Sequence, residues 1–167
     1  LWEARQGPWE NGSWQGPGSG LFRSRDGGST WTQLTKGLPT VEQGLGRIGI
    51  EISRTEKKRL YAVVDAPKLG GIFRSDDAGD SWTRVANEPR LWGRGNDFAE
   101  VQVDVRNADT VYVANTSSYK STDGGATWTC FKGSPGGDDY HTIWQNPKHP
   151  EGMLMVGDQG ASVSLND

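Results

Sequence analysis

The chain has 167 residues, a net charge of −3 and a mean hydropathy of −0.70, enough for one domain of ordinary size. No apolar run reaches membrane-spanning length, and the dispersed lysines and arginines exclude the basic field expected of a nucleic-acid-binding protein. The 24 glycines and 8 tryptophans indicate short strands joined by tight turns, and a lone cysteine excludes an internal disulfide.

Residues 1–35 predict part of a repeated unit. Residues 1–4 match the second half of a strand, and a further strand begins near Leu21. A polar turn follows, with the form Ser24-Arg-Asp26-Gly-Gly28-Ser-Thr30-Trp31. The next strand starts near Thr32, so the turn is predicted to join two strands.

Residues 46–87 predict a complete unit of four strands. Ile48, Ile50 and Ile52 alternate with other residues, which favours a strand with one buried face. The four strands are expected near 47–53, 59–65, 71–75 and 81–86. The turn motif returns before the last of them as Ser75-Asp-Asp77-Ala-Gly79-Asp-Ser81-Trp82.

Residues 97–133 predict a second complete unit of the same form. Alternation at Ala99, Val101 and Val103 marks its first strand, and the four strands are expected near 98–104, 110–115, 118–122 and 127–132. The turn motif reads Ser121-Thr-Asp123-Gly-Gly125-Ala-Thr127-Trp128. Cys130 follows it, and we expect a half-buried packing residue there rather than a nucleophile.

Residues 140–167 predict another partial unit. His141, Ile143 and Gln145 form the alternating run, and residues 152–156 weakly copy the second strand. Residues 164–167 resemble the opening of a fourth turn motif. The chain is thus expected to start inside one unit and stop inside another. The remaining units are expected from a longer chain or from strand edges pairing between copies.

The shared motif, called the box turn here, is Ser-x-Asp-x-Gly-x-Ser/Thr-Trp. Its first serines lie 51 and 46 residues apart, a spacing typical of four-stranded propeller blades. We expect the aspartate to accept hydrogen bonds from its own turn, the glycine to adopt a positive φ and the tryptophan to fold back over the hairpin. A structural role is therefore assigned to Ser24, Asp26, Gly28, Trp31, Ser75, Asp77, Gly79, Trp82, Ser121, Asp123, Gly125 and Trp128.

The predicted fold is all-β, a partial β-propeller of four-stranded antiparallel blades with a box turn between strands three and four. No segment shows a sustained helical period with caps, so almost no helix is expected. The predicted domain is a single partial propeller, divided into a partial blade, two blades and a partial blade at residues 1–35, 46–87, 97–133 and 140–167.

These motifs resemble the Asp boxes, or BNR repeats, of sialidases, sortilin-type receptors, xyloglucanase-like glycoside hydrolases and photosystem assembly factors. The resemblance covers nearly the whole chain and is strongest to bacterial sortilin-like or glycosyl-hydrolase BNR-repeat proteins. It is carried by segments 46–50, 71–77, 109–113 and 137–144. The resemblance implies the fold and an extracytoplasmic location, but the boxes serve structure in proteins of unrelated function.

The turns after strands two and four of each blade fall on the face opposite the box turns. That face collects residues 5–19, 66–70, 87–97, 132–140 and 158–160, which are rich in aromatic and charged residues. Long turns on a rigid scaffold commonly carry function, and flat indole faces suit sugar rings. The candidate ligand-binding residues are Trp9, Trp14, Trp92, Arg94, Asp97, Asp139, His141 and Asp158. The alternative interpretation is that the tryptophans cover blade edges.

Enzyme chemistry is harder to assign. Dispersed arginines disfavour a sialidase, and the acids outside the boxes offer no pair selected by spacing. Asp76–Asp80 lacks calcium-loop alternation, and two histidines without a cysteine partner disfavour zinc, so neither a metal nor a cofactor is expected. We therefore predict a module that binds glycan or peptide. The alternatives are a fragment of a xyloglucanase-like hydrolase and a structural scaffold in a larger assembly.

Overall fold

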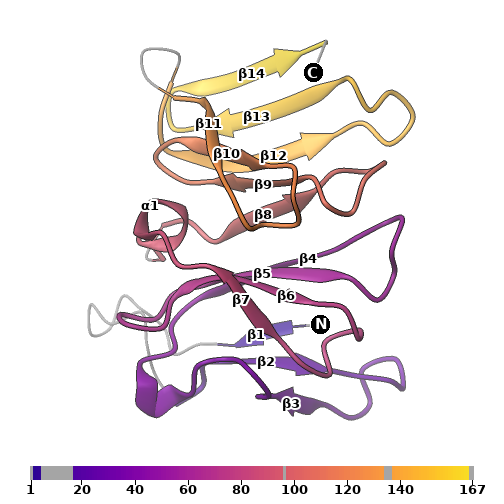
Figure 1. Cartoon of the computed structure of the whole chain (residues 1–167), viewed down its shortest axis with the longest axis vertical. Helices are drawn as coiled ribbons and strands as arrows, with labels where there is room; N and C mark the ends of the chain where they lie inside the picture. Colours follow the sequence, from indigo (N-terminus) through magenta and orange to yellow (C-terminus); the bar gives the residue numbers. More distant parts are fainter. Residues whose placement is uncertain (1, 5–16, 96, 134–136, 166–167) are drawn as a thin grey trace.

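The computed structural model describes residues 2–4, 17–95, 97–133 and 137–165, which form four antiparallel sheets (Figure 1). The first sheet contains β1 (Trp2–Ala4), β2 (Gly20–Arg23) and β3 (Thr32–Leu34). The second contains β4 (Ile48–Ile52), β5 (Leu60–Val64), β6 (Gly71–Ser75) and β7 (Thr83–Ala86).

The other two sheets follow the same chain order. The third contains β8 (Glu100–Val103), β9 (Val111–Ala114), β10 (Ser118–Ser121) and β11 (Thr129–Lys132). The last contains β12 (Tyr140–Gln145), β13 (Met153–Gly157) and β14 (Gly160–Ser164). The all-β prediction, with four-stranded antiparallel sheets, is confirmed.

Helix is confined, within the described residues, to two short turns. One is a 3-10 turn at Val41–Gln43, and the other is α1 (Pro89–Trp92). Neither approaches the length and apolar character needed to cross a membrane.

Each strand pairs with its sequence neighbours, and the sheets follow one another along the long axis of the molecule (Figure 1). In this view α1 and the β13–β14 turn lie on the left, whereas the β2–β3 and β4–β5 turns lie on the right. We call the first side the α1 face; its described turn residues are 65–70, 87–95, 97–99, 115–117, 137–139 and 157–159. The other side, which carries the box turns, is the box face.

Apolar clusters fill the spaces between sheets. Trp82 is 5% exposed and packs in one cluster with Leu34 of the first sheet and Leu60 and Phe73 of the second. Trp128, 6% exposed, lies with residues of the second and third sheets in the next cluster. A third cluster lies between the third and last sheets and contains Tyr112, Ala114, Tyr140, Ile143, Met153 and Met155.

The box turns are closed by their own side chains. In the second box, Asp77 accepts hydrogen bonds from Ser75 Oγ at 2.7 Å, from the Ser81 amide at 2.8 Å and from Ser81 Oγ at 2.5 Å. These donors lower the pKa of Asp77 to about 2. Gly79 has φ 90°, a left-handed conformation that favours glycine. The carboxylate is therefore occupied within the turn.

Trp31 folds back over its own hairpin as expected, because its indole nitrogen donates to the Gly28 carbonyl at 3.0 Å. Its side chain is nevertheless 44% exposed, because no sheet among the described residues lies beyond its outer side. Two local expectations were wrong. His141 is exposed and Tyr140 is buried instead, since a register shift between Tyr140 and Thr142 interrupts the alternation. Cys130 is exposed because β11 is the outermost strand of its sheet.

Candidate functional site

A hydrogen-bonded network on the α1 face is centred on Arg94. Its guanidinium donates to Asp97 Oδ2 at 2.9 Å, to Asp139 Oδ1 at 3.0 Å and to Thr116 Oγ1 at 3.1 Å. Arg94 and Asp97 come from the β7–β8 connection, Thr116 from the β9–β10 turn and Asp139 from the β11–β12 connection. The site therefore joins three turns that lie far apart in sequence.

Local structure explains how Arg94 is presented. Pro89 opens α1, where its fixed φ suits the first helical position, and Leu91 is fully buried beneath it. The amides of Asp97 and Phe98 both donate to the Arg94 carbonyl, at 2.9 and 2.8 Å. This tight turn places the Arg94 and Asp97 side chains next to each other.

An aromatic contact extends the network toward the last sheet. The Arg94 guanidinium carbon lies 4.9 Å from the centroid of the Phe98 ring, and that ring lies 4.9 Å from His141. His141 Nε2 lies 2.7 Å from Asp158 Oδ1, and the Asp158 amide donates to the Asp139 carbonyl at 3.2 Å. The path from Asp97 to Asp158 is thus continuous.

The network is open to solvent. Side-chain exposure is 42% for Arg94, 41% for Asp97 and 65% for Asp158, so these ion pairs contribute little to stability. Because the Arg94 charge already faces two carboxylates, the site offers hydrogen-bonding oxygens and amides rather than a spare positive charge. This arrangement suits a neutral, hydroxyl-rich ligand better than an anion.

Five of the eight predicted ligand residues lie in this network, namely Arg94, Asp97, Asp139, His141 and Asp158. Trp92 is half-buried and packs on the second cluster, and its indole occupies the space that a Gly70 side chain would fill. Its indole nitrogen donates to the Asn87 carbonyl at 3.3 Å. Trp92 is therefore mainly a packing residue, and part of its side chain stays accessible to solvent. Trp9 and Trp14 lie outside the described residues.

Sequence reasoning missed three members of the site. Phe98 is 2% exposed and reads in the sequence as an ordinary core residue, while Thr116 carries no distinguishing signal. Arg47 donates to the Asp97 carbonyl at 3.0 Å, although it precedes that residue by 50 positions. Arg47 follows Gly46 and directly precedes β4, the first strand of its sheet. This position is the one sequence signal that could have placed Arg47 on the α1 face.

Two glutamates lie on the first strands of neighbouring sheets. Glu51 on β4 accepts from Gln102 Nε2 at 3.4 Å, and burial raises the pKa of Glu51. Burial and then repulsion by Glu51 raise the pKa of Glu100 on β8 to about 7, against the opposing charge of Arg47. A carboxyl group protonated near neutral pH is suited to general-acid chemistry.

No family model matches this chain. The chain is 30% identical over 149 residues to a xyloglucanase of Paenibacillus sp, covering 75% of this chain and 14% of that protein. It is 28% identical over 120 residues to a probable oligoxyloglucan-reducing end-specific xyloglucanase of Neosartorya fischeri, covering 70% and 15% respectively. The chain therefore spans about one seventh of the length of the curated relatives it matches.

Solved structures share the architecture. A GH74 enzyme of Niastella koreensis matches with a TM-score of 0.68 at 18% identity, over 88% of this chain and 25% of that chain. YCF48 bound to D1 peptide matches with a TM-score of 0.58 at 18% identity, over 89% and 45%. The four sheets are blades of a β-propeller. The comparisons relate the chain to propellers of the glycoside-hydrolase type, and the structural likeness itself concerns the fold alone.

Proposed function

We propose that this chain is part of a xyloglucanase-like glycoside hydrolase of the Asp-box, or BNR-repeat, class, and that it binds the glycan along the α1 face. The observation that carries the proposal is similarity to four xyloglucanases, at 26–33% identity over 58–75% of this chain. The resemblance to bacterial sortilin-like BNR-repeat proteins, noted from the sequence, belongs to this proposal as well.

The α1 face supplies the contacts that a sugar chain needs. Asp97 and Asp158 present exposed carboxylate oxygens to accept hydrogen bonds from hydroxyls. The charge of Arg94 is balanced by Asp97 and Asp139. The accessible part of Trp92 offers an apolar surface beside the same turn. A neutral glycan is preferred because the carboxylates of Asp97, Asp139 and Asp158 repel an anionic one.

Hydrolysis needs a proton donor as well as binding groups. Glu100 fits that role because its raised pKa keeps the carboxyl group protonated close to neutral pH. Glycan binding without hydrolysis would favour the recognition-module alternative. Because xyloglucan is a polysaccharide, an extracytoplasmic location belongs to the same proposal.

Affinity electrophoresis tests the binding site. The protein is run in native gels with and without xyloglucan, using polygalacturonate as the anionic comparison. We expect xyloglucan alone to retard the parent, and Asp97→Asn and Asp158→Asn to weaken binding about fivefold to tenfold, the loss of one charge-assisted hydrogen bond each. Lys57→Ala, an exposed residue in the β4–β5 turn on the box face, is the control.

Two results would contradict the proposal. One is a mobility that xyloglucan does not change. The other is retardation that persists in both aspartate variants but is lost in Lys57→Ala, which would place the ligand on the box face. Release of reducing ends from xyloglucan, measured on the parent and on Glu100→Gln, then separates hydrolysis from binding alone.

A further inference from the structure

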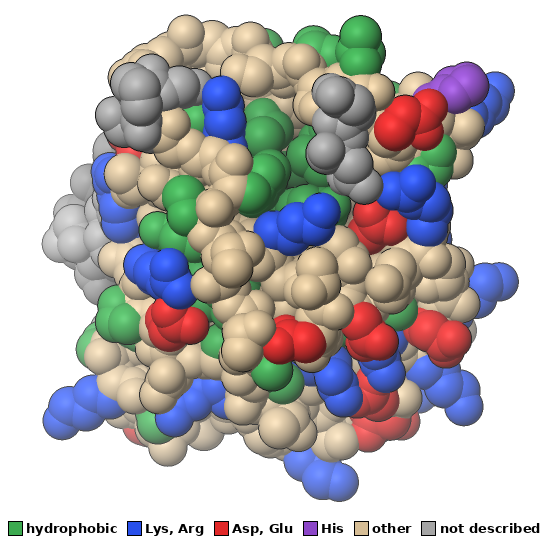
Figure 2. Space-filling view, turned by 45° about the horizontal axis from the view of Figure 1, so that its top comes forward, with side chains coloured by type: hydrophobic (Ala, Val, Ile, Leu, Met, Phe, Trp, Pro, Cys, Tyr) green, Lys and Arg blue, Asp and Glu red, His purple; other side chains and the backbone are tan. Residues whose placement is uncertain are grey.

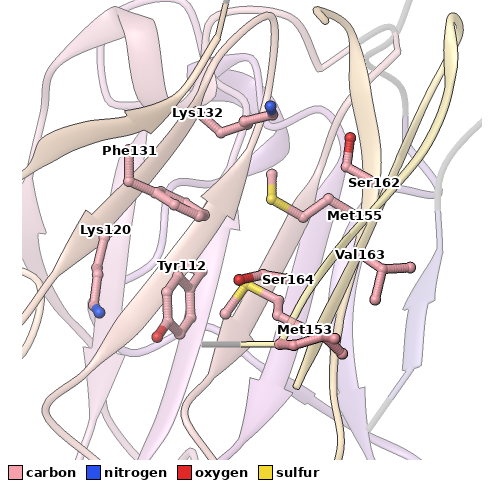
Figure 3. A pocket seen from close by; sticks show the side chains of 10 residues that line it. Tyr112, Lys120, Phe131, Lys132, Met153, Met155, Ser162, Val163 and Ser164 are labelled. Carbon is pink, nitrogen blue, oxygen red and sulfur yellow. The ribbon is translucent and has the colours of Figure 1, made fainter. Parts of the chain in front are cut away.

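A cavity of about 710 Å³ lies between the third and last blades, away from the α1-face network. Tyr112, Phe131, Met153 and Met155 form its apolar walls, and Figure 3 shows the Phe131 ring pointing toward the methionines. Figure 2 shows hydrophobic side chains gathered in a hollow with basic side chains around it. We call this cavity the Met groove.

The strand registers identify what the groove corresponds to in the other blades. Val111 lies opposite Ser121 in the third blade, and Met153 lies opposite Ser164 in the last blade. Met153 and Met155 are therefore the equivalents of Val111 and Val113, which share the Trp128 cluster.

The opposite wall of the groove, formed by the third blade, also has an equivalent in the preceding blade. Tyr112 lies opposite Lys120, just as Tyr61 in the preceding blade lies opposite Arg74. Tyr61 belongs to the cluster that contains Trp128. Both walls of the Met groove are therefore equivalent to the two walls that enclose Trp128 between the second and third blades.

The strand beside the groove has an open edge. Within the described residues β14 pairs only with β13, whereas its equivalents β6 and β10 are each also paired with a following strand. Val163 on β14 is 69% exposed and Leu165 just beyond it is 77% exposed. Unpaired edges of this kind accept a further strand through main-chain hydrogen bonds.

We propose that the Met groove binds a β-strand that begins with tryptophan, with the indole between Tyr112 and the methionines and the strand antiparallel to β14. The two occupied examples are Trp82 before β7 and Trp128 before β11. The Trp128 indole nitrogen donates to the Gly125 carbonyl at 2.9 Å, so a box turn satisfies its own indole. The apolar walls then need to supply no polar partner.

A labelled peptide with the sequence of residues 75–86 tests this directly on the 167-residue chain, since it contains a box, Trp82 and a following strand. Fluorescence anisotropy measures binding, and hydrogen exchange shows which amides become protected. We expect saturable binding with protection of residues 160–165. Replacing the peptide tryptophan with alanine should weaken binding about tenfold or more, because the indole is the anchor.

A variant of the protein separates groove binding from nonspecific adhesion. Val163→Asp places a charge on the exposed edge without disturbing a buried residue, and it should weaken binding about tenfold, whereas Val163→Thr should retain it. Equal affinity of the tryptophan and alanine peptides, or protection outside β14, would overturn the proposal. The proposal would also be overturned if xyloglucan oligosaccharide, or dimerisation without peptide, protected the β14 amides from exchange, because the groove would then have a different occupant. The test is independent of the α1 face.

Discussion

At the scale of single residues, the three box tryptophans share a motif but not an environment. Trp82 and Trp128 are buried between blades, while Trp31 is 44% exposed. Trp82→Ala and Trp128→Ala should each lower the free energy of unfolding by roughly 3–5 kcal/mol, because each leaves a large cavity. Trp31→Ala should cost about 1 kcal/mol or less. Chemical denaturation of the three variants measures the difference, and three equal losses would contradict it.

The raised pKa of Glu100 makes stability depend on pH. The folded chain holds this proton with a pKa of about 7, against 4.5 for an ordinary glutamate. The folded state therefore binds more protons between these values, and stability falls as pH rises through the interval. Glu100→Gln should flatten that fall and melt above the parent at slightly alkaline pH. Thermal melts across the interval test this, with exposed Glu56→Gln as the control; parallel curves for parent and Glu100→Gln would refute it.

The candidate site was only partly predictable from the sequence. Arg94, Asp97 and Asp139 could be named because they are charged residues in long turns on one face. The pairing of Arg94 with Asp139 could not, since it spans 45 positions and depends on how neighbouring blades pack. The pKa of Glu100 was equally hidden because it arises from burial beside Glu51.

At the scale of elements, the box turn is held by its aspartate. Asp26, Asp77 and Asp123 each have a pKa of about 2, since serine or threonine hydroxyls and backbone amides donate to them. Stability from these depressed pKa values is present above the ordinary value of 3.8 and is lost as pH falls toward 2.

Replacing the aspartate should therefore matter most near neutral pH. Asp77→Ala should lower the melting temperature more than Asp26→Ala, because Ser75, which donates to Asp77 and accepts from the Gly79 amide, is buried, whereas the equivalent Ser24 in the first box is not. The gap between the parent and Asp77→Ala should narrow as pH approaches about 2, where the carboxylate becomes protonated. Circular-dichroism melts at both pH values measure it, and a constant gap would be inconsistent with this account.

Strand positions followed well from period-two alternation, with limited errors at the ends. The fourth strands begin at Thr83 and Thr129 rather than two residues earlier, because the box turns retain Trp82 and Trp128. The shift at Tyr140 escaped prediction because a bulge needs no special residue in the sequence.

At the scale of the whole molecule, the blades approach most closely at their first strands. A side-chain carbon added to Gly49 on β4 would clash with the Ala99 carbonyl oxygen, and only a shift of the backbone could remove that clash. Gly49→Ala should therefore destabilise the chain by about 1–3 kcal/mol or more through overpacking between two blades.

Ile52→Ala on the same strand provides the matched control. Its side chain is 45% exposed, so the free energy of unfolding should change by about 1 kcal/mol or less. Urea titration of both variants makes the comparison. A Gly49→Ala variant as stable as the parent would show that the two blades can separate without cost.

The pairing of every strand with its sequence neighbours bears on how such a chain reaches its fold. Each blade draws its hydrogen bonds from one contiguous stretch of the chain, so the loops closed during folding are short and the contact order is low for a β protein. A blade can then form while its successor is still unfolded, and its exposed face becomes the template on which the next one condenses. Duplication of one stretch in a gene would add a complete folding unit, leaving the hydrogen bonds of the older units unchanged.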